Sequence, residues 1–246
     1  MYYRDLAEDY DKELLYAFYN QILMPSFGTI PDEIEDVETL EYQLENGNFN
    51  TERDYVLHCV LALDDVKHEL LGGFCCEYYP QSNCSLITYV STHPERRPRG
   101  LGRLMMDQIK KISKMEAISH GYDDIAAIFL ESNTNAVKHD IMNPEYRRKV
   151  LGKLGARYLD FSYVQPRLAP TKKACGTLYL GVLEQSIVSL PNGAQGIPSS
   201  IVLAFLTEFY TVLMGTQALE SDPDCLRQVE QLKKADFVFV ESSLHH

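Results

Sequence analysis

Residues 96–103 combine four arginines and two glycines at the start of a predicted helix. The N-terminus of a helix leaves several backbone N–H groups without an intrahelical partner and carries the positive end of the helix dipole. Gly100 and Gly102 allow a ligand to approach the backbone closely. The guanidinium groups of Arg96, Arg97, Arg99 and Arg103 can add charge-assisted hydrogen bonds to phosphate oxygens. These residue types at this spacing predict an anion site that fits a diphosphate.

The alternative is an exposed basic loop that only caps the helix, with glycines that serve the turn. Two common nucleotide-binding motifs do not fit the stretch, because neither G-x-x-x-x-G-K-[ST] nor G-x-G-x-x-G occurs in it. A P-loop or a dinucleotide-binding fold is therefore not supported.

The elements around this stretch alternate between strands and helices. Leu101, Met105 and Ile109 mark one face of a helix that ends near Gly121, and a mostly apolar strand precedes the stretch. The predicted strands are residues 55–63, 70–79, 84–92, 125–131, 156–164 and 175–183, and the other helices are residues 6–22, a short helix after Pro31 and a segment after Pro144. Strand–helix–strand units require parallel crossovers, whereas hairpins require antiparallel pairing. The order therefore predicts an α/β (mixed α+β) fold with helices on both faces of a mixed sheet.

The character of the chain changes after Glu184. Residues 189–200 read as a loop or linker, and they precede an apolar helix over residues 201–214 and a charged helix over residues 224–234. We therefore expect a main domain over residues 1–188 and a C-terminal helical extension over residues 189–246. The extension either packs on the main domain or forms a homodimer interface.

Composition limits the partners and the location. The net charge of −12 disfavours nucleic acid, because phosphate binding needs a basic surface, and it mildly favours a cationic substrate. No run approaches the roughly 20 apolar residues of a membrane span, and the start lacks the features of a signal peptide. We therefore expect a cytoplasmic protein without a membrane partner. The six cysteines include no C-x-x-C pair, so we expect reduced thiols and no metal.

The stretch "YVSTHPERRPRGLGRLMM" resembles the acyl-CoA-binding loop of the GCN5-related N-acetyltransferases. Residues 97–102, "RPRGLG", fit that family's Arg/Gln-x-x-Gly-x-Gly/Ala motif. Asn133-x-x-Ala136 fits a second family signature, and "LGKLGARYLDF" is similar to the segment that enters the sixth strand. The resemblance covers about residues 5–185. It implies a mostly antiparallel sheet of about six to seven strands.

The resemblance also implies a cosubstrate, acetyl-CoA or coenzyme A, and no metal. The backbone of residues 97–103 would hold the pyrophosphate, and the exposed backbone of residues 90–92 would pair with the pantetheine arm. An N–H near Thr92 would polarise the acyl carbonyl. The cofactor-binding residues so implied are Val90, Ser91, Thr92, Arg97, Pro98, Arg99, Gly100, Leu101, Gly102, Arg103 and Asn133.

The activity implied by the resemblance is N-acetyl transfer to an amine of a small molecule or a peptide, by direct attack in a ternary complex. An alkylammonium must lose a proton before it attacks, and Glu77 and Glu131 are the candidate bases. A solvated or ion-paired carboxylate is an equally good interpretation of each. The alternatives are a non-catalytic acyl-CoA-binding sensor or assembly protein, and an enzyme for longer acyl groups or a hydroxyl acceptor.

The tyrosine that often protonates the departing thiolate in the family is missing. Its place holds Leu151 when counted from Gly155, and Asp140 when counted from Ala136. Tyr146 is a candidate for this acid role, with a structural tyrosine or a water molecule as the alternatives.

Other polar residues give weaker signals. His58, His68 and His93 are interpreted as structural, and Cys76 is disfavoured as a nucleophile because the sequence places no histidine beside it. Tyr163, Gln165 and Arg167 lie in a linker expected to face the acceptor.

Overall fold

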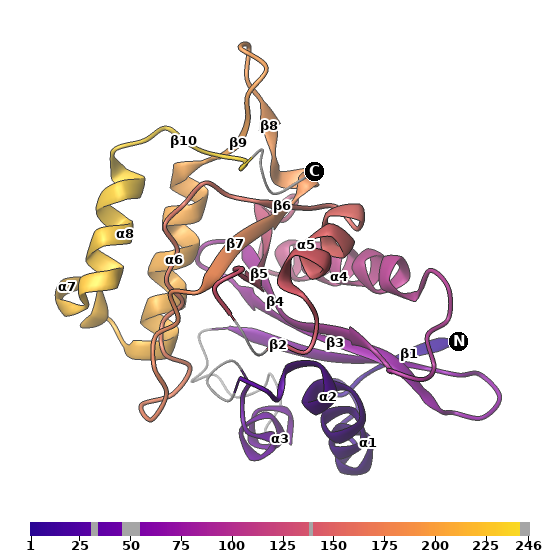
Figure 1. Ribbon diagram of the computed structural model, residues 1–246. Coiled ribbons are helices and arrows are strands. Elements are labelled where there is room, and N and C mark those ends of the chain that lie inside the picture. The colour runs from indigo at the N-terminus through magenta and orange to yellow at the C-terminus, as the bar shows by residue number, and fades with distance from the viewer. Residues whose placement is uncertain (31–33, 46–54, 138–139, 242–246) are drawn as a thin grey trace.

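A computed structural model of the chain describes residues 1–30, 34–45, 55–137 and 140–241. Seven strands form one sheet in the order β1-β2-β3-β4-β5-β7-β6 (Figure 1). The strands are β1 (Tyr2–Asp5), β2 (Val56–Leu63), β3 (Leu70–Tyr79), β4 (Cys84–Thr92), β5 (Ala127–Asn133), β6 (Ala156–Tyr158) and β7 (Leu178–Leu183). Only β4 and β5 are parallel, and every other neighbouring pair is antiparallel. The predicted mixed, mostly antiparallel sheet is confirmed.

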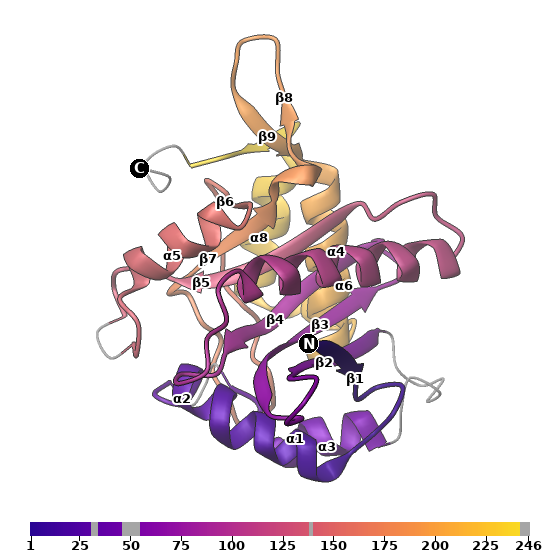
Figure 2. The same ribbon diagram turned by 90° about the vertical axis from the view of Figure 1, so that its right-hand side faces the viewer.

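Helices cover both faces of this sheet (Figures 1 and 2). One face carries α4 (Leu101–Ser119) and α5 (Pro144–Lys153). The other face carries α1 (Lys12–Phe18), the π-helical turn η1 (Tyr19–Leu23), α2 (Met24–Phe27) and α3 (Val37–Glu45). Apolar side chains of α4 such as Met105 and Ile109 pack against Phe74 and Ile128 of the sheet. Each large apolar side chain buried in this way contributes about 1.5–3 kcal/mol, which fixes α4 and the loop before it against the strands.

The ends of several elements differ from the sequence predictions. The predicted helix over residues 6–22 begins only at Lys12, because residues 2–5 form the edge strand β1 and Asp11 caps the helix by accepting a hydrogen bond from the N–H of Leu14. The helix expected after Pro31 begins at Val37, and Pro31 itself lies outside the described residues. The last two strands of the sheet are shorter than predicted, since they span only residues 156–158 and 178–183.

The expected loop over residues 189–200 contains a hairpin. The strands β8 (Val188–Ser189), β9 (Gln195–Pro198) and β10 (Phe237–Phe239) form a small second sheet in the order β10-β9-β8. The turn contains Asn192 and Gly193, and Gly193 has a φ of 83°, which glycine adopts without strain. Asn-Gly is a strong hairpin signal, so the sequence carried the information for this element.

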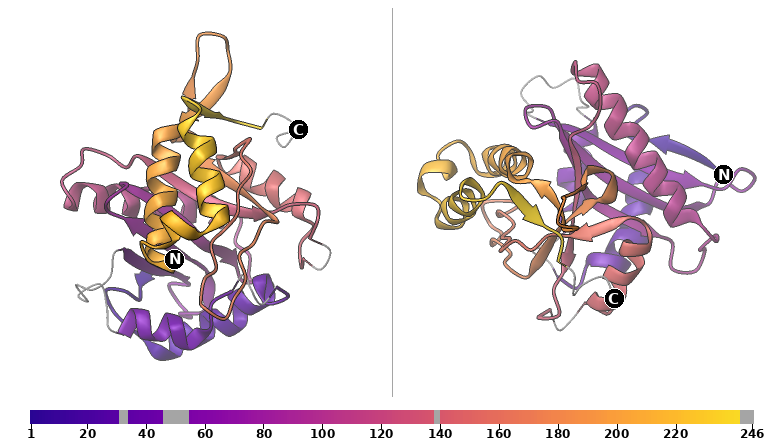
Figure 3. Two further views of the ribbon diagram at one scale, coloured as in Figure 1. Left: turned by 90° about the vertical axis from the view of Figure 1, so that its left-hand side faces the viewer. Right: turned by 90° about the horizontal axis from the view of Figure 1, so that it is seen from above.

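The C-terminal extension shares a core with the main sheet. The short 3-10 helix η3 (Glu184–Ser186) precedes the extension, which contains α6 (Ser199–Met214), α7 (Ala218–Ser221) and α8 (Pro223–Lys233). Phe205 and Phe209 of α6 belong to one buried cluster with Tyr79 and Phe129 of the sheet. Figure 3 shows α8 lying beside α6. The apolar face of α6 is therefore covered by the chain's own sheet, while the domain boundary after residue 188 and a homodimer stay predictions.

Candidate active site

The parallel strands β4 and β5 separate along their length. They pair only where residues 84–87 of β4 lie beside residues 127–130 of β5. Beyond this point β4 continues beside β3, and β5 continues beside β7. A pocket of about 390 Å³ opens between them, and its lining includes Thr88, Val90, Thr92, Glu131 and Asn133.

The backbone of β4 faces this pocket at alternate residues. A bulge at Thr88 shifts the register, because Ile87 lies opposite Cys76 while Tyr89 lies opposite Cys75. The N–H of His93 donates to the carbonyl of Leu71 on β3. Since hydrogen bonding alternates along an antiparallel pair, Ser91 also bonds toward β3, and the N–H and C=O groups of Val90 and Thr92 point into the slot.

Ser91 thus differs from its two neighbours on β4. Its hydroxyl lies 2.8 Å from the Ser26 hydroxyl, which ties the strand to α2. Of the three residues predicted to pair with a pantetheine arm, only Val90 and Thr92 present their backbone to the pocket.

The arginine and glycine stretch forms a loop that leads into α4. Gly100 precedes the helix with a φ of 83°, and no side chain caps the first turn. Arg97 and Gly102 line the pocket. Arg97, Arg99 and Arg103 are exposed and form no ion pair with any residue that the structure describes. Three guanidinium groups are therefore exposed to solvent around the start of α4, and Arg97 among them lies at the end of the slot.

The remaining residues of the loop give it its shape. The carbonyl of Pro98 accepts a hydrogen bond from the N–H of Leu101, and the Leu101 side chain is buried under α4. Arg96 instead lies 2.6 Å from His93 Nε2 and donates to the Gln21 side chain at 3.3 Å. The sequence predicts four available guanidinium groups, but Arg96 is used within the protein.

A network of charged and polar side chains forms the α5 wall of the pocket. Asp140 accepts two hydrogen bonds from Arg147, at 2.6 and 2.8 Å, and one from Asn133 Nδ2 at 3.0 Å. Arg147 also lies over the ring of Phe27, at 5.9 Å from its centre, and so connects α5 with α2. Asn133 Oδ1 is buried and has no hydrogen-bond partner among the described residues.

Tyr146 lies at the mouth of the pocket, on the first turn of α5. Its side chain is 61% exposed and lines the pocket. Its backbone N–H donates to the side chain of Asn143, which caps the helix. The structure therefore brings this tyrosine to the site, and its hydroxyl forms no hydrogen bond with any residue that the structure describes.

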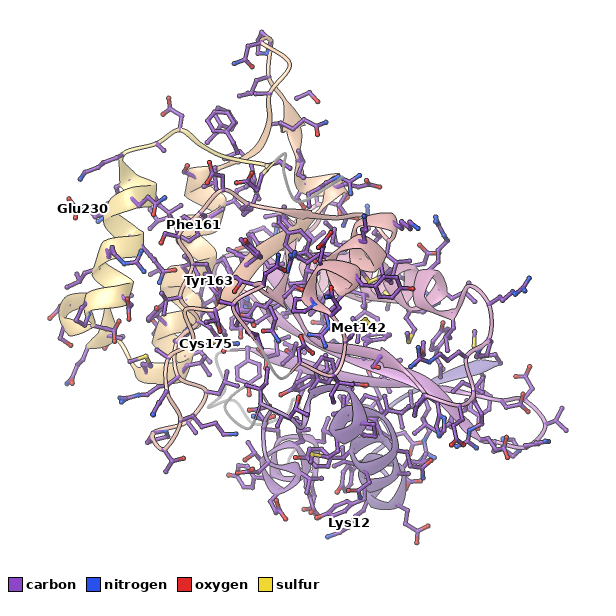
Figure 4. All side chains as sticks on the ribbon, in the orientation of Figure 1. Lys12, Met142, Phe161, Tyr163, Cys175 and Glu230 are labelled. Atoms are coloured by element: carbon purple, nitrogen blue, oxygen red, sulfur yellow. The ribbon has the colours of Figure 1, made fainter. Side chains whose placement is uncertain are left out.

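Glu131 forms the opposite wall of the pocket. Its carboxylate accepts a hydrogen bond from the Tyr163 hydroxyl and a second from Gln165 Nε2 at 2.7 Å. Tyr163 is labelled in Figure 4 and packs in the core between α6 and the sheet. Tyr163 and Gln165, predicted to face the acceptor, lie beside this carboxylate, whereas Arg167 is exposed and does not line the pocket.

Glu77 lies on the same face of the sheet as Glu131 but behind the pocket lining. The Tyr79 hydroxyl donates to its carboxylate. Burial and the negative charges of Glu35 and Glu131 raise the pKa of Glu77 to about 8, although the bond from Tyr79 acts in the opposite direction. A buried carboxyl group near other carboxylates is harder to ionise, so Glu77 takes up a proton more readily than an exposed glutamate.

The opposite face of the sheet holds a buried ion cluster. His58 Nδ1 lies 2.6 Å from Asp5, and His58 Nε2 lies 3.1 Å from Glu116 of α4. Burial lowers the pKa of His58, but hydrogen bonds to the two carboxylates and their charges outweigh it and raise the value to about 9. The structural interpretation of this histidine agrees with these contacts.

Cys76 lies directly opposite His58 on the neighbouring strand. The sequence did not place a histidine beside Cys76, because cross-strand pairing is not visible in it. The thiol is buried and its pKa is raised well above the usual value by that burial, so it is not an activated nucleophile.

The sheet is mixed, and its two parallel strands separate in front of a glycine-containing loop that leads into a helix. This arrangement defines the class of fold to which the protein belongs. The sequence model of the Acetyltransferase (GNAT) family matches residues 16–139, which is half of the chain. The chain belongs to the GNAT family.

One solved structure shares the fold of this chain, and others are also similar to it. A GNAT-family protein from Bacteroides thetaiotaomicron is 15% identical, covers 87% of this chain and 99% of its own, and has a TM-score of 0.54. Tetrahymena GCN5 is 14% identical over 74% of this chain and 96% of its own, with a TM-score of 0.44. An aminoglycoside 6'-N-acetyltransferase complexed with coenzyme A is 18% identical over 74% and 95%, with a TM-score of 0.43. Comparison with curated protein sequences gives no match.

Within the described residues, no three or more His, Cys, Asp or Glu side chains are grouped so that they could hold a metal ion. In the same part of the chain, every helix is too short or too polar to cross a membrane.

Proposed function

We propose that the protein transfers an acetyl group from acetyl-CoA to an amine of a small molecule or a peptide. The observation that carries this proposal is the slot between β4 and β5, which has an anion-binding loop at one end and Glu131 in its wall. Family membership supports acetyl transfer as the class of activity. The net charge of −12 is consistent with an amine rather than a nucleic acid as partner.

Coenzyme A would bind along β4. The first-turn amides of α4 and the exposed guanidinium groups of Arg97, Arg99 and Arg103 would hold its diphosphate. The slot-facing backbone of Val90 and Thr92 would pair with the amides of the pantetheine arm, and the buried Oδ1 of Asn133 would accept one further hydrogen bond. The N–H of Thr92 or Val90 would stabilise the negative charge on the acyl oxygen.

Transfer needs a base and an acid. We assign the base to Glu131, because its carboxylate lines the pocket whereas that of Glu77 does not. The amine nitrogen attacks the acyl carbon as Glu131 takes its proton, and the C–S bond then breaks. The thiolate receives a proton from Tyr146 or from water. Because Glu77 is largely protonated at pH 7, we assign it the role of tuning the charge beside Glu131.

The first test is release of coenzyme A from acetyl-CoA, detected with a thiol reagent across a panel of amines and peptides. Thermal stabilisation by acetyl-CoA is measured in parallel. We expect stabilisation together with release that depends on one class of amine. Stabilisation without release from any acceptor would favour an acyl-CoA-binding sensor, for which the absent family tyrosine is the supporting observation.

The coenzyme A loop is tested by Gly100→Glu, with Gly121→Glu as a matched control. Both glycines have a positive φ, of 83° and 89°, and an added Cβ meets no atom within 4 Å at either position. The two variants therefore share the backbone strain of about 1 kcal/mol. Only Gly100→Glu places a carboxylate at the proposed diphosphate site, so we expect it alone to weaken coenzyme A binding, by about 100-fold in calorimetric titration. Equal affinities in the two folded variants would contradict the loop assignment.

A further inference from the structure

The C-terminal extension forms hydrogen bonds with the backbone of the segment that holds Glu131. Gln228 of α8 is fully buried, and its Oε1 accepts a hydrogen bond from the N–H of Val164 at 2.9 Å. Its Nε2 donates to the Val164 carbonyl at 3.1 Å and to the Tyr210 hydroxyl at 2.8 Å. Tyr210 of α6 in turn donates to the same carbonyl at 3.0 Å. Two helices of the extension thus saturate both backbone groups of a single residue.

Val164 lies between the two residues that hold Glu131. Tyr163 and Gln165 are separated by two positions, so in an extended segment their side chains point to the same side. Both donate to the carboxylate of Glu131. Fixing the backbone of Val164 therefore fixes both donors to the pocket carboxylate at once.

A second set of contacts runs from α6 to Glu77. The buried carboxylate of Glu208 accepts hydrogen bonds from the N–H groups of Gln81 and Ser82, at 3.0 and 2.7 Å, and so holds the turn that follows β3. The rings of Phe205 and Phe209 contact the edge of Tyr79 with centroid distances of 5.7 and 5.8 Å.

Tyr79 is the residue that donates to Glu77. Each of the two acceptor-side carboxylates is therefore held by a hydroxyl group whose position depends on the extension.

We propose that the C-terminal extension is a positioning element for the acceptor-side carboxylates, and that Gln228 is the positioning residue for Glu131. Its kinetic consequence rests on the proposed function. A merely structural extension would cover the sheet, and any buried residue in it would then matter only through stability. Figure 4 shows Tyr163 on the same side of the molecule as α6 and α8.

The test compares Gln228→Met with Leu232→Ala in the full-length chain. Methionine keeps the shape of the side chain but removes both polar contacts with Val164. Leu232 lies on the same helix, is 2% exposed and packs in the shared core, but its side chain has no group that could form a hydrogen bond with Val164. Both variants are expected to unfold at lower temperature, Leu232→Ala at least as much, because it creates a cavity.

The kinetic readout separates the two variants well below their unfolding temperatures. Gln228→Met should lower kcat about 10-fold and leave KM for acetyl-CoA within about twofold. The acidic limb of its pH–rate profile should move to higher pH, because a carboxylate that loses hydrogen-bond donors takes up a proton more readily. Leu232→Ala should keep the wild-type kcat and pH profile. Equal kcat values and equal profiles in the two variants would overturn the proposal.

A second readout does not depend on turnover. The ¹³C carboxyl resonance of Glu131, assigned with Glu131→Gln, should titrate at higher pH in Gln228→Met than in the wild type, and unchanged in Leu232→Ala. Absence of amine-dependent release in the wild type would reject the proposed function, whereas an unshifted resonance in Gln228→Met would reject the positioning role. If Gln228→Met does not fold, Tyr210→Phe replaces it in both measurements. This variant removes one of the two donors to the Val164 carbonyl, so we expect a smaller shift.

Discussion

Glu77 of β3 and Glu116 of α4 are half-buried glutamates whose carboxylates lie on opposite sides of one sheet. Their pKa values are shifted from the usual value in opposite directions. Burial raises the pKa of both groups. For Glu116 the hydrogen bond and charge of His58 outweigh burial and lower the pKa. For Glu77 the neighbouring carboxylates Glu35 and Glu131 add to burial, and the pKa rises to about 8.

The difference in pKa shift distinguishes a structural cluster of charged residues from a cluster that could take part in catalysis. On the α4 face, Asp5 and Glu116 both contact the imidazole ring of His58, so each carboxylate has a partner within the protein. On the other face, Glu77 is held by a hydroxyl and shares its surroundings with the pocket residue Glu131. A carboxyl group that exchanges its proton near neutral pH beside an open slot suits acid–base chemistry.

The largest expected effect is on turnover, from Glu131→Gln. Removing the proposed base should lower amine-dependent kcat by about 100-fold, the lower end of what general base catalysis provides. Acetyl-CoA affinity measured by calorimetry should not change, because the diphosphate loop is untouched. Glu116→Gln makes the same chemical change on the other face and should keep kcat. A loss of turnover in Glu116→Gln as large as that in Glu131→Gln would contradict the assignment of the reactive carboxylate to only one face of the sheet.

The next effect is on stability, from His58→Gln. The folded pKa of His58 is raised to about 9 from 6.5, so its contribution is complete below pH 6.5 and is lost as the pH rises to about 9. We expect the wild type to exceed the variant by about 2 kcal/mol more at pH 6 than at pH 9.5. Urea unfolding across this range measures the difference.

His68→Asn is the control for this experiment, because His68 is exposed and asparagine tolerates its φ of 56°. The variant keeps the contacts of His58 with Asp5 and Glu116, so the pH-dependent contribution of His58 should be retained. A constant difference between the wild type and His58→Gln at all pH values would show that His58 is not charged in the folded protein.

The parts of the site that are local in sequence could be predicted from it. Residues 97–102 form their loop from consecutive positions, and the glycine with positive φ and the helix that follows can be read directly. The strand order is similarly readable, because apolar runs and turns mark β2 to β5. The edge strand β1 was missed because four residues before an amphipathic pattern carry little signal.

The acceptor side could not be predicted, because it is assembled from distant segments. Glu131 receives its hydrogen bonds from residues 163 and 165, which are themselves held by α6 and α8. No single-sequence pattern reports such pairings. A single sequence also does not show that Cys76 lies opposite His58, or that the guanidinium group of Arg96 contacts His93. Glu77 and Glu116 look alike in sequence, and only their surroundings separate them.

The smallest expected effect is a gain of stability from Glu77→Gln. The folded pKa of Glu77 is raised to about 8 from 4.5, so the folded state loses stability relative to the unfolded chain as the pH rises from 4.5 to 8. Glutamine resembles the protonated carboxyl and removes this penalty. The variant should match the wild type near pH 4.5 and exceed it by about 1–2 kcal/mol at pH 8.5, a figure reduced for partial solvent access.

Urea unfolding at both pH values measures this gain, and Glu116→Gln, which loses the bond to His58, should have the opposite sign. Turnover of Glu77→Gln at pH 7 should stay within about threefold of the wild type, because the carboxyl it replaces is already largely protonated there. If Glu77→Gln were instead less stable than the wild type at pH 8.5, Glu77 would be a paired carboxylate like Glu116, and the two faces of the sheet would not differ in the way proposed.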